Sequence, residues 1–273
     1  MACSSDPVPP PSAGRSPAGE KMTPVLVSSE LVVGDNRVVL GLLDENDAPA
    51  ADPDIDVVVA PLGPDGEPGG GIRTDFVWSL KPVVGVYVTN MTFPSAGTFE
   101  AVVQVRGENV DQTTPLSLDV AQEGTTPPLG GAAPSIDTPT GDTPTEIERI
   151  STDNDPDPRF YAYSIADALN QSSPFVIVFA TPKFCTSQVC GPTLDTVKDV
   201  SREFKDVNFV HVEPYELPVD PSKPEIVPAG EAWGLPSEPY VFVVDAKGRV
   251  AAKYEGVVGA VELTEQLREL TRR

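Results

Sequence analysis

The sequence predicts two folded domains of different class, an all-β sandwich followed by an α/β domain. Up to about residue 122, apolar residues come in short runs separated by turn residues, which is typical of strands. After about residue 158, strand-like runs alternate with segments of helical spacing. A proline-rich stretch lies between them, and a length of 273 residues suits two modest domains.

Composition excludes several classes of function. With 19 basic and 41 acidic residues, the net charge is −22, so we expect no binding to nucleic acid or to an anionic membrane face. No apolar run approaches the ~20 residues that a membrane-spanning helix needs. One histidine and three cysteines leave no zinc finger or histidine-rich metal site. Thiol chemistry remains, without a metal or an organic cofactor.

Residues 1–22 are rich in proline, serine and glycine, a composition that predicts a disordered tether. Ala2 and Cys3 followed by this polar stretch resemble the start of a mature bacterial lipoprotein. The resemblance implies a lipid on Cys3 and an extracytoplasmic protein anchored to the cell membrane through that lipid alone. The alternative is an unmodified terminal cysteine.

Residues 23–122 are predicted to form the β-sandwich. Along one run, Phe99, Ala101, Val103 and Val105 alternate with polar residues, as in a strand with one buried face. Several such strands at turn-like intervals resemble a generic immunoglobulin-like domain. This resemblance implies a spacer or a module that binds a protein partner. Residues 123–157 are then a linker rich in proline, glycine and threonine.

Residues 158–273 alternate between helical and strand patterns. Ser164 is a good N-cap for a short helix, and the continuous apolar run 175–179 is typical of a strand buried on both faces. The remaining elements follow in the order helix, strand, hairpin and helix: apolar residues at helical spacing from Leu194 to Phe204, a strand at 207–212, a hairpin of 240–244 and 250–254, and a final helix with Leu263, Leu267 and Leu270 on one face.

This domain resembles the membrane-tethered thioredoxin-like proteins of bacteria, which are thiol-disulfide oxidoreductases. The resemblance lies in the run Val176–Thr181, the pair Cys185 and Cys190, Gly191-Pro192, and the segment Pro236–Gly248. It implies a thioredoxin-like fold and disulfide exchange with protein thiols or disulfides. It also implies that Pro239 is a cis-proline beside the redox cysteines.

The spacing of the cysteines departs from that family, because four residues rather than two separate Cys185 from Cys190. In a continuous helix the two would be too far apart to bridge, so they can pair only if their segment is a loop. Pro192 predicts that a helix begins near Gly191. Cys190 would then lie at the helix N-terminus, where backbone N–H groups stabilise a thiolate, and we expect it to be the nucleophile with Cys185 as its partner.

Five further residues are candidates for the site. Trp233, Glu238 and Tyr240 flank Pro239 and could contact a substrate, or could simply pack at a loop. His211 and Glu213 lie two apart on a strand, so both point to the side where the cysteine loop should emerge and could tune a thiol. The alternative for His211 is a hydrogen-bonded structural histidine.

Three alternative functions remain open. The cysteine pair could be a static disulfide in a non-catalytic surface binding protein. The Cys-x4-Cys spacing is also similar to that of atypical two-cysteine peroxiredoxins, which implies a thiol peroxidase with Cys185 as the peroxide-reactive residue. Cys185, Cys190 and His211 together resemble, weakly, the copper(I) ligands of Sco-type chaperones.

Overall fold

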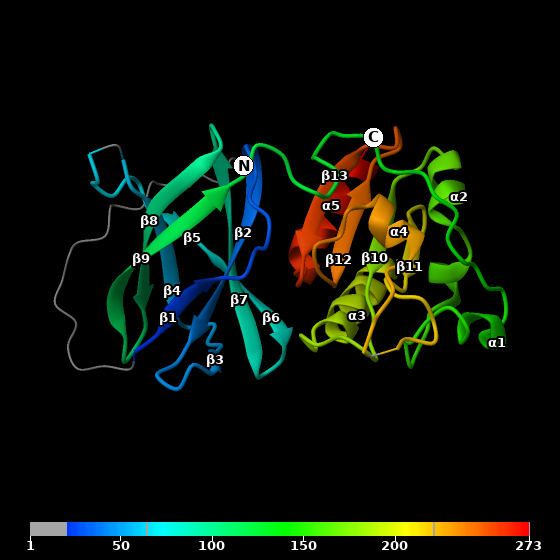
Figure 1. Cartoon of the computed structure of the whole chain (residues 1–273), viewed down its shortest axis with the longest axis horizontal. Helices are drawn as coiled ribbons and strands as arrows, with labels where there is room; N and C mark the ends of the chain where they lie inside the picture. The colour runs from blue at the N-terminus through cyan, green and yellow to red at the C-terminus, as the bar shows by residue number, and fades with distance from the viewer. Residues whose placement is uncertain (1–20, 64, 221, 273) are drawn as a thin grey trace. The chain divides into compact units, whose positions relative to one another are not determined.

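A computed structural model describes residues 21–63, 65–220 and 222–272 (Figure 1). The chain divides into two compact units, with the boundary between Gly124 and Thr125. Cys3 and nearly all of the predicted tether lie outside the described residues. Met22 belongs to the buried apolar cluster of the first unit, so the folded part of this unit includes Met22.

The first unit consists of two antiparallel sheets (Figure 1). One sheet has the order β1-β2-β7-β6, with β3 also paired to β2: Thr23–Leu26, Gly34–Leu43, Val84–Phe93, Asp75–Leu80 and Pro49–Ala50. The other has the order β5-β4-β8-β9: Ile72–Arg73, Asp56–Pro61, Gly97–Arg106 and Asp111–Val120. One apolar cluster takes residues from both sheets, among them Leu40, Val59 and Val103. The predicted β-sandwich is therefore confirmed.

The second unit is built on one four-stranded sheet of order β11-β10-β12-β13. The strands are Asn208–Val212, Phe175–Phe179, Tyr240–Val244 and Val250–Glu255. β10 runs parallel to β11 and antiparallel to β12, and β12 and β13 form the predicted antiparallel pair. The helical segments are α1 (Pro144–Ile147), η1 (Pro158–Tyr161), α2 (Ile165–Asn170), α3 (Cys190–Ser201), α4 (Pro228–Ala232) and α5 (Ala260–Thr271).

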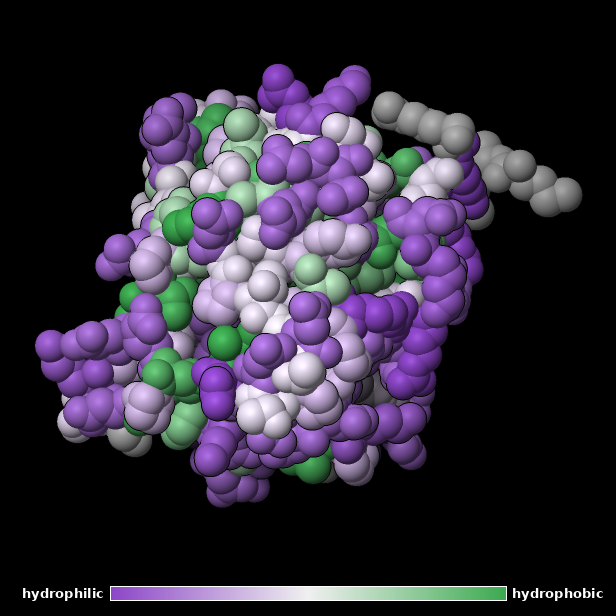
Figure 2. All heavy atoms as spheres, turned by 90° about the vertical axis from the view of Figure 1, so that its right-hand side faces the viewer, coloured by the Kyte–Doolittle hydropathy of each residue, from purple (hydrophilic) through white to green (hydrophobic). Residues whose placement is uncertain are grey.

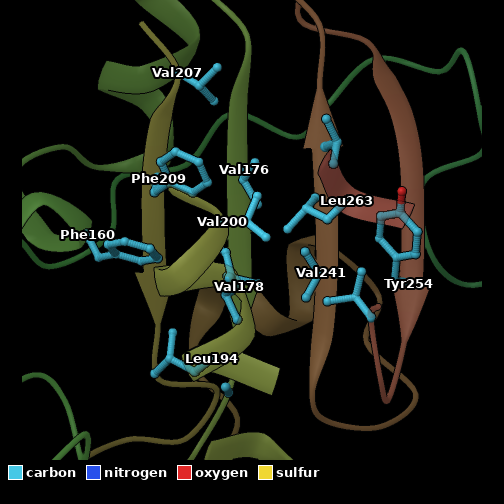
Figure 3. Close-up of a cluster of buried hydrophobic side chains, with 14 of the residues drawn as sticks. Phe160, Val176, Val178, Leu194, Val200, Val207, Phe209, Val241, Tyr254 and Leu263 are labelled. Carbon is cyan, nitrogen blue, oxygen red and sulfur yellow. The ribbon is translucent and has the colours of Figure 1, made fainter. Parts of the chain in front are cut away.

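Both faces of this sheet are covered, which is why β10 and β12 read as continuous apolar runs. On one face, Val176, Val178 and Val241 pack against Leu194 of α3 and Leu263 of α5 (Figure 3). On the other face, a second cluster packs alternate residues of the same strands against α2 and α4: Phe175, Ile177, Phe179, Phe242, Ile165, Ala229 and Trp233. The cysteine loop leaves β10 at the end of this buried strand.

The fold class predicted for the C-terminal domain, α/β and thioredoxin-like, is wrong. Of the residues that the structure describes, 36% lie in strands, which form three sheets, and 17% lie in helices; no α/β thioredoxin-like domain is evident among them. Two of the three strand pairs in the second sheet are antiparallel, and α1, α2 and α4 contain six residues or fewer. The physical reason is that apolar periodicity marks strands and helices but determines neither how strands pair nor how far a capped helix extends.

Residues 125–157, nearly all of the predicted linker, belong to the second unit; we call this segment the strap. Its main chain bonds to the β12–β13 hairpin, since Gly130 N–H donates to Val250 O at 2.8 Å and Ala133 N–H donates to Gly248 O at 2.9 Å. Ile147 of α1 is 1% exposed within the core cluster. The second folded unit therefore begins at residue 125 rather than 158.

Candidate functional site

A disulfide joins Cys185 to Cys190 in the loop between β10 and α3, with the two Cα atoms 6.0 Å apart. Cys185 N–H donates to Thr181 O at 3.0 Å, which forms a tight turn directly after β10. Gln188 has a positive φ of 61°, a value that helical residues do not adopt, and the chain then enters α3 at Cys190. The segment is thus a loop, as the four-residue spacing requires for pairing.

The two sulfurs of this disulfide have different surroundings. Cys190 is 0% exposed and belongs to the apolar core, whereas Cys185 is only partly buried. Cys190 N–H donates to Cys185 Sγ at 3.3 Å, and the Ser187 hydroxyl lies 3.2 Å from the same sulfur. The backbone N–H at the start of α3 therefore donates its hydrogen bond to Cys185 Sγ. This differs from the expectation that the helix N-terminus would activate Cys190, because the Cys190 side chain points into the core while its amide points at the other sulfur.

Pro239 lies beside the start of this loop. The Glu238–Pro239 bond is cis, and the next residue, Tyr240, pairs with Phe179 at the end of β10. Pro239 O accepts a hydrogen bond from Gly256 N–H at 2.8 Å. Pro239 is buried. The hydrogen bond from Gly256 holds its carbonyl group beside the end of β13.

The residues that flank Pro239 take different roles. Trp233 is 0% exposed, with its ring 4.7 Å from that of Phe242, and Tyr240 is 3% exposed and stacks on the same ring at 4.9 Å. Both are therefore core residues that pack in the interior, and they do not form a surface that a substrate could contact. Glu238 stays partly exposed and accepts a hydrogen bond from Tyr215 Oη at 2.8 Å.

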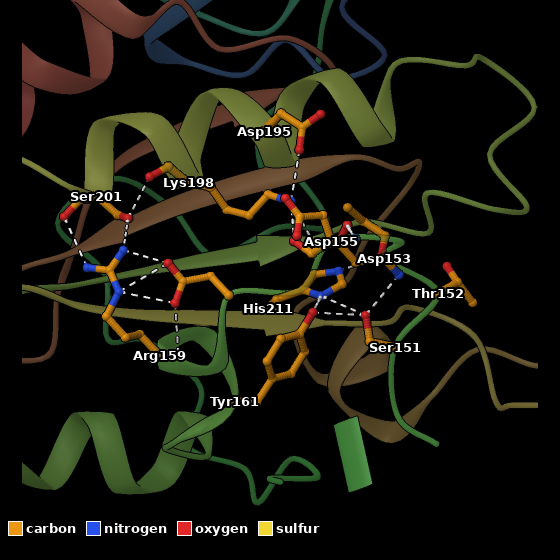
Figure 4. Close-up of polar contacts among 12 residues, drawn as sticks. Ser151, Thr152, Asp153, Asp155, Arg159, Tyr161, Asp195, Lys198, Ser201 and His211 are labelled. Atoms are coloured by element: carbon orange, nitrogen blue, oxygen red, sulfur yellow. Dashed lines mark hydrogen bonds and ion pairs between the residues drawn. The ribbon is translucent and has the colours of Figure 1, made fainter. Parts of the chain in front are cut away.

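His211 is a buried, hydrogen-bonded histidine (Figure 4). Its Nε2 lies 2.9 Å from Ala180 O and its Nδ1 lies 2.9 Å from Tyr161 Oη. A carbonyl oxygen only accepts, so Nε2 carries the proton and Nδ1 accepts from the tyrosine. Burial lowers the pKa of His211 to about 4, so the ring is neutral at pH 7. With both nitrogens engaged, the ring offers no free lone pair for copper(I).

Glu213 connects the end of β11 to the cysteine loop. Its Oε2 accepts from Thr152 N–H at 2.9 Å and from Thr152 Oγ1 at 3.0 Å, and the same Oγ1 accepts from Lys183 N–H at 3.3 Å. Burial raises the pKa of Glu213, while the neighbouring Thr181 hydroxyl lowers it in part. With the residues that the structure describes, neither Glu213 Oε1 nor Thr181 Oγ1 makes a hydrogen bond of ordinary geometry.

Several residues around the site have no local sequence signal. Thr152 of the strap, Tyr161 of η1 and Thr193 of α3 reach partners 61, 50 and 63 residues away. A cavity of about 400 Å³ also opens at the end of β11, with Glu213, Tyr215 and Arg149 among the residues that line it. Within the described ranges, no three potential metal-binding side chains of His, Cys, Asp or Glu gather at one place.

No protein-family model matches the chain, and no curated protein matches it. Among solved structures, the chain is similar to the Lin-41 filamin domain, with 12% identity and a TM-score of 0.24 over 39% of this chain and 100% of that one. It is also similar to the PKD domain of the human VPS10 domain-containing receptor SorCS2, with 13% identity and a TM-score of 0.21 over 45% of this chain and 82% of that one. Both are immunoglobulin-like domains, and neither likeness bears on the cysteine loop.

Proposed function

We propose that this protein exchanges the Cys185–Cys190 disulfide with thiols or disulfides of partner proteins. The observation that carries the proposal is the asymmetry of the pair. Cys185 offers a partly exposed sulfur that accepts the N–H of the first residue of α3, and Cys190 lies buried behind it. A sulfur that is accessible and receives a helix N-terminal N–H is stabilised as a thiolate and is suited to exchange.

In the oxidised protein, a thiolate of the partner attacks Cys185 Sγ. The new bond joins the partner sulfur to Cys185, the Cys185–Cys190 bond breaks, and Cys190 leaves with the electron pair as a thiolate that takes up a proton. A second partner thiolate then attacks the partner's sulfur in the mixed disulfide and releases Cys185 as a thiolate. The partner is oxidised to a disulfide and the protein is reduced to a dithiol, and the reverse sequence reduces a partner disulfide.

The test compares single-cysteine variants of the full chain. Cys3→Ser combined with Cys190→Ser leaves only Cys185, and Cys3→Ser combined with Cys185→Ser leaves only Cys190. We expect Cys185 to form a mixed disulfide with oxidised glutathione at least about tenfold faster than Cys190, because only the former is accessible. Mass spectrometry of timed samples measures both rates. Equal rates, or a faster Cys190, would contradict the assigned roles.

A second candidate is a binding protein in which the disulfide only holds the loop. The complete burial of Cys190 within the core favours it, since a structural crosslink needs no accessible leaving sulfur. In that case reduced glutathione does not open the Cys185–Cys190 disulfide of the unmodified protein, and the β-sandwich becomes the region in which to seek a partner.

The proposed location is extracytoplasmic, where disulfides form and persist. The disulfide of the second unit supports it. Among the described residues, no helix combines the length and the apolar character needed to span a bilayer. We propose attachment through a lipid at Cys3, which mass spectrometry of the protein isolated from its native cell would detect.

A further inference from the structure

Thr193 links the helix of the cysteine loop to the segment that holds Pro239. The side chain lies in the first turn of α3 and is 2% exposed. Its Oγ1 donates to Gly256 O at 3.0 Å, and Gly256 N–H in turn donates to Pro239 O at 2.8 Å. One hydroxyl therefore joins the start of α3 to the end of β13, and through Gly256 to Pro239.

The first turn of α3 lacks the usual side-chain stabilisation. Val189 is the N-cap residue and provides no capping hydrogen bond, although serine, threonine, aspartate and asparagine commonly do so. Thr193 N–H donates to Val189 O at 2.9 Å and closes the turn, so Thr193 belongs to the first hydrogen-bonded ring of the helix. An uncapped terminus frays readily, and a side-chain bond to a neighbouring strand opposes the fraying.

The same turn carries the group that matters most for exchange. Cys190 is the first residue of α3, and its N–H is the donor to Cys185 Sγ at 3.3 Å. A shift of the turn by a fraction of an ångström would weaken this hydrogen bond, because such bonds lose strength as they lengthen and bend. The position of the donor thus depends on what holds the turn in place.

We infer that Thr193 is a positioning residue for disulfide exchange, because its hydroxyl holds the first turn of α3 where the Cys190 amide can donate to the Cys185 sulfur. The inference rests on the proposed function. It assigns the effect to the hydroxyl group, which valine lacks and serine retains, and not to the volume of the side chain.

Thr193→Val removes the hydroxyl and keeps the shape. In the reduced Thr193→Val protein, we expect the midpoint of the pH profile of Cys185 alkylation to move upward and exchange with oxidised glutathione at pH 7 to slow by about three- to tenfold, the size of one net hydrogen bond. Thr193→Ser should restore both values. Thr196→Val is the matched control, since Thr196 Oγ1 donates to Pro192 O at 2.9 Å within the same helix.

The measurement uses the full chain in a Cys3→Ser background, with iodoacetamide labelling of Cys185 followed by mass spectrometry from pH 5 to 10. An unchanged Thr193→Val profile, or an equal shift in Thr196→Val, overturns the inference. If Thr193→Val does not fold, Thr193→Ser and Thr193→Ala replace it, and equal profiles for these two overturn the inference. If the unmodified pair does not exchange with glutathione, the proposed function fails, while the alkylation profiles still decide the role of Thr193.

Discussion

His211 illustrates how a single buried residue links stability to pH. Its ring is enclosed by Ala180 O and Tyr161 Oη, and burial lowers its pKa from 6.5 to about 4. A histidine whose folded-state pKa is depressed contributes stability that is fully present above its unfolded pKa and is lost as the pH falls towards the folded value. Glu213, whose pKa is raised by burial, acts in the opposite sense, because its contribution is lost as the pH rises.

We therefore expect His211→Gln to flatten the pH dependence of stability. Between pH 6.5 and pH 4, the free energy of unfolding of the unmodified protein should fall more steeply than that of the variant, by up to about 3 kcal/mol. Urea titrations at several pH values measure this difference. The fluorescence of Trp233 reports on the second unit once Trp78 of the first unit is replaced by phenylalanine. Parallel slopes for the two proteins would show that His211 does not hold the assigned neutral state.

Residues of the site could be predicted from sequence only where the signal is local. The start of α3 within one residue of Gly191 follows from Pro192, which suits the first turn of a helix. The exposure of a sulfur is not a local property, so the sequence predicts that Cys190 lies at the start of the helix but does not predict that its side chain is buried. Trp233 stands near Pro239 in the sequence, but its indole ring is buried and packs against Phe242 of β12.

At the scale of elements, α3 is fixed to the strap by a buried ion pair (Figure 4). Lys198 Nζ lies 2.9 Å from Asp153 Oδ2, and the two side chains are only 10% and 9% exposed. Lys198 also contacts Asp195 Oδ1 at 2.8 Å, but Asp195 is 68% exposed. Burial lowers the pKa of Lys198, yet its bonds to the two carboxylates outweigh that effect and raise it.

The two aspartates provide a matched comparison around one lysine. Asp153→Ala should destabilise the second unit by about 3 kcal/mol, because it removes the buried partner of a buried charge. Asp195→Ala should cost less than about 1 kcal/mol, since water screens an exposed pair. Urea unfolding followed by Trp233 fluorescence measures both. Similar losses in the two variants would mean that Asp153 does not anchor the strap.

Elements could be predicted from sequence where apolar runs mark them. The strand bounds expected at 175–179 and 240–244 match β10 and β12, because both faces of these strands are buried and every residue is apolar or aromatic. The strap gave no such signal. Its prolines and glycines are typical of a linker. The hydrogen-bond partners of Gly130 and Ala133 lie more than a hundred positions away in the sequence, and Ile147 packs in the core of the second unit.

At the scale of the whole molecule, charge and surface limit the kinds of partner. The net charge of −22 disfavours nucleic acid, and the side of the chain drawn in Figure 2 is mostly hydrophilic, with hydrophobic residues in small separate patches. The thiol exchange that we propose needs only a brief encounter with a partner, for which a large apolar docking face is not required. The β-sandwich is the part of the chain with no chemistry assigned, and its role as spacer or binding module stays a prediction.

The central claim is that the Cys185–Cys190 disulfide exchanges rather than only crosslinks. Its most direct test is the reduction potential of the pair in the full-length Cys3→Ser protein, equilibrated against glutathione and dithiothreitol buffers and read by mass spectrometry of alkylated samples. An exchanging pair should have a potential above about −300 mV. A potential well below about −300 mV would make the disulfide structural and would contradict the proposed function.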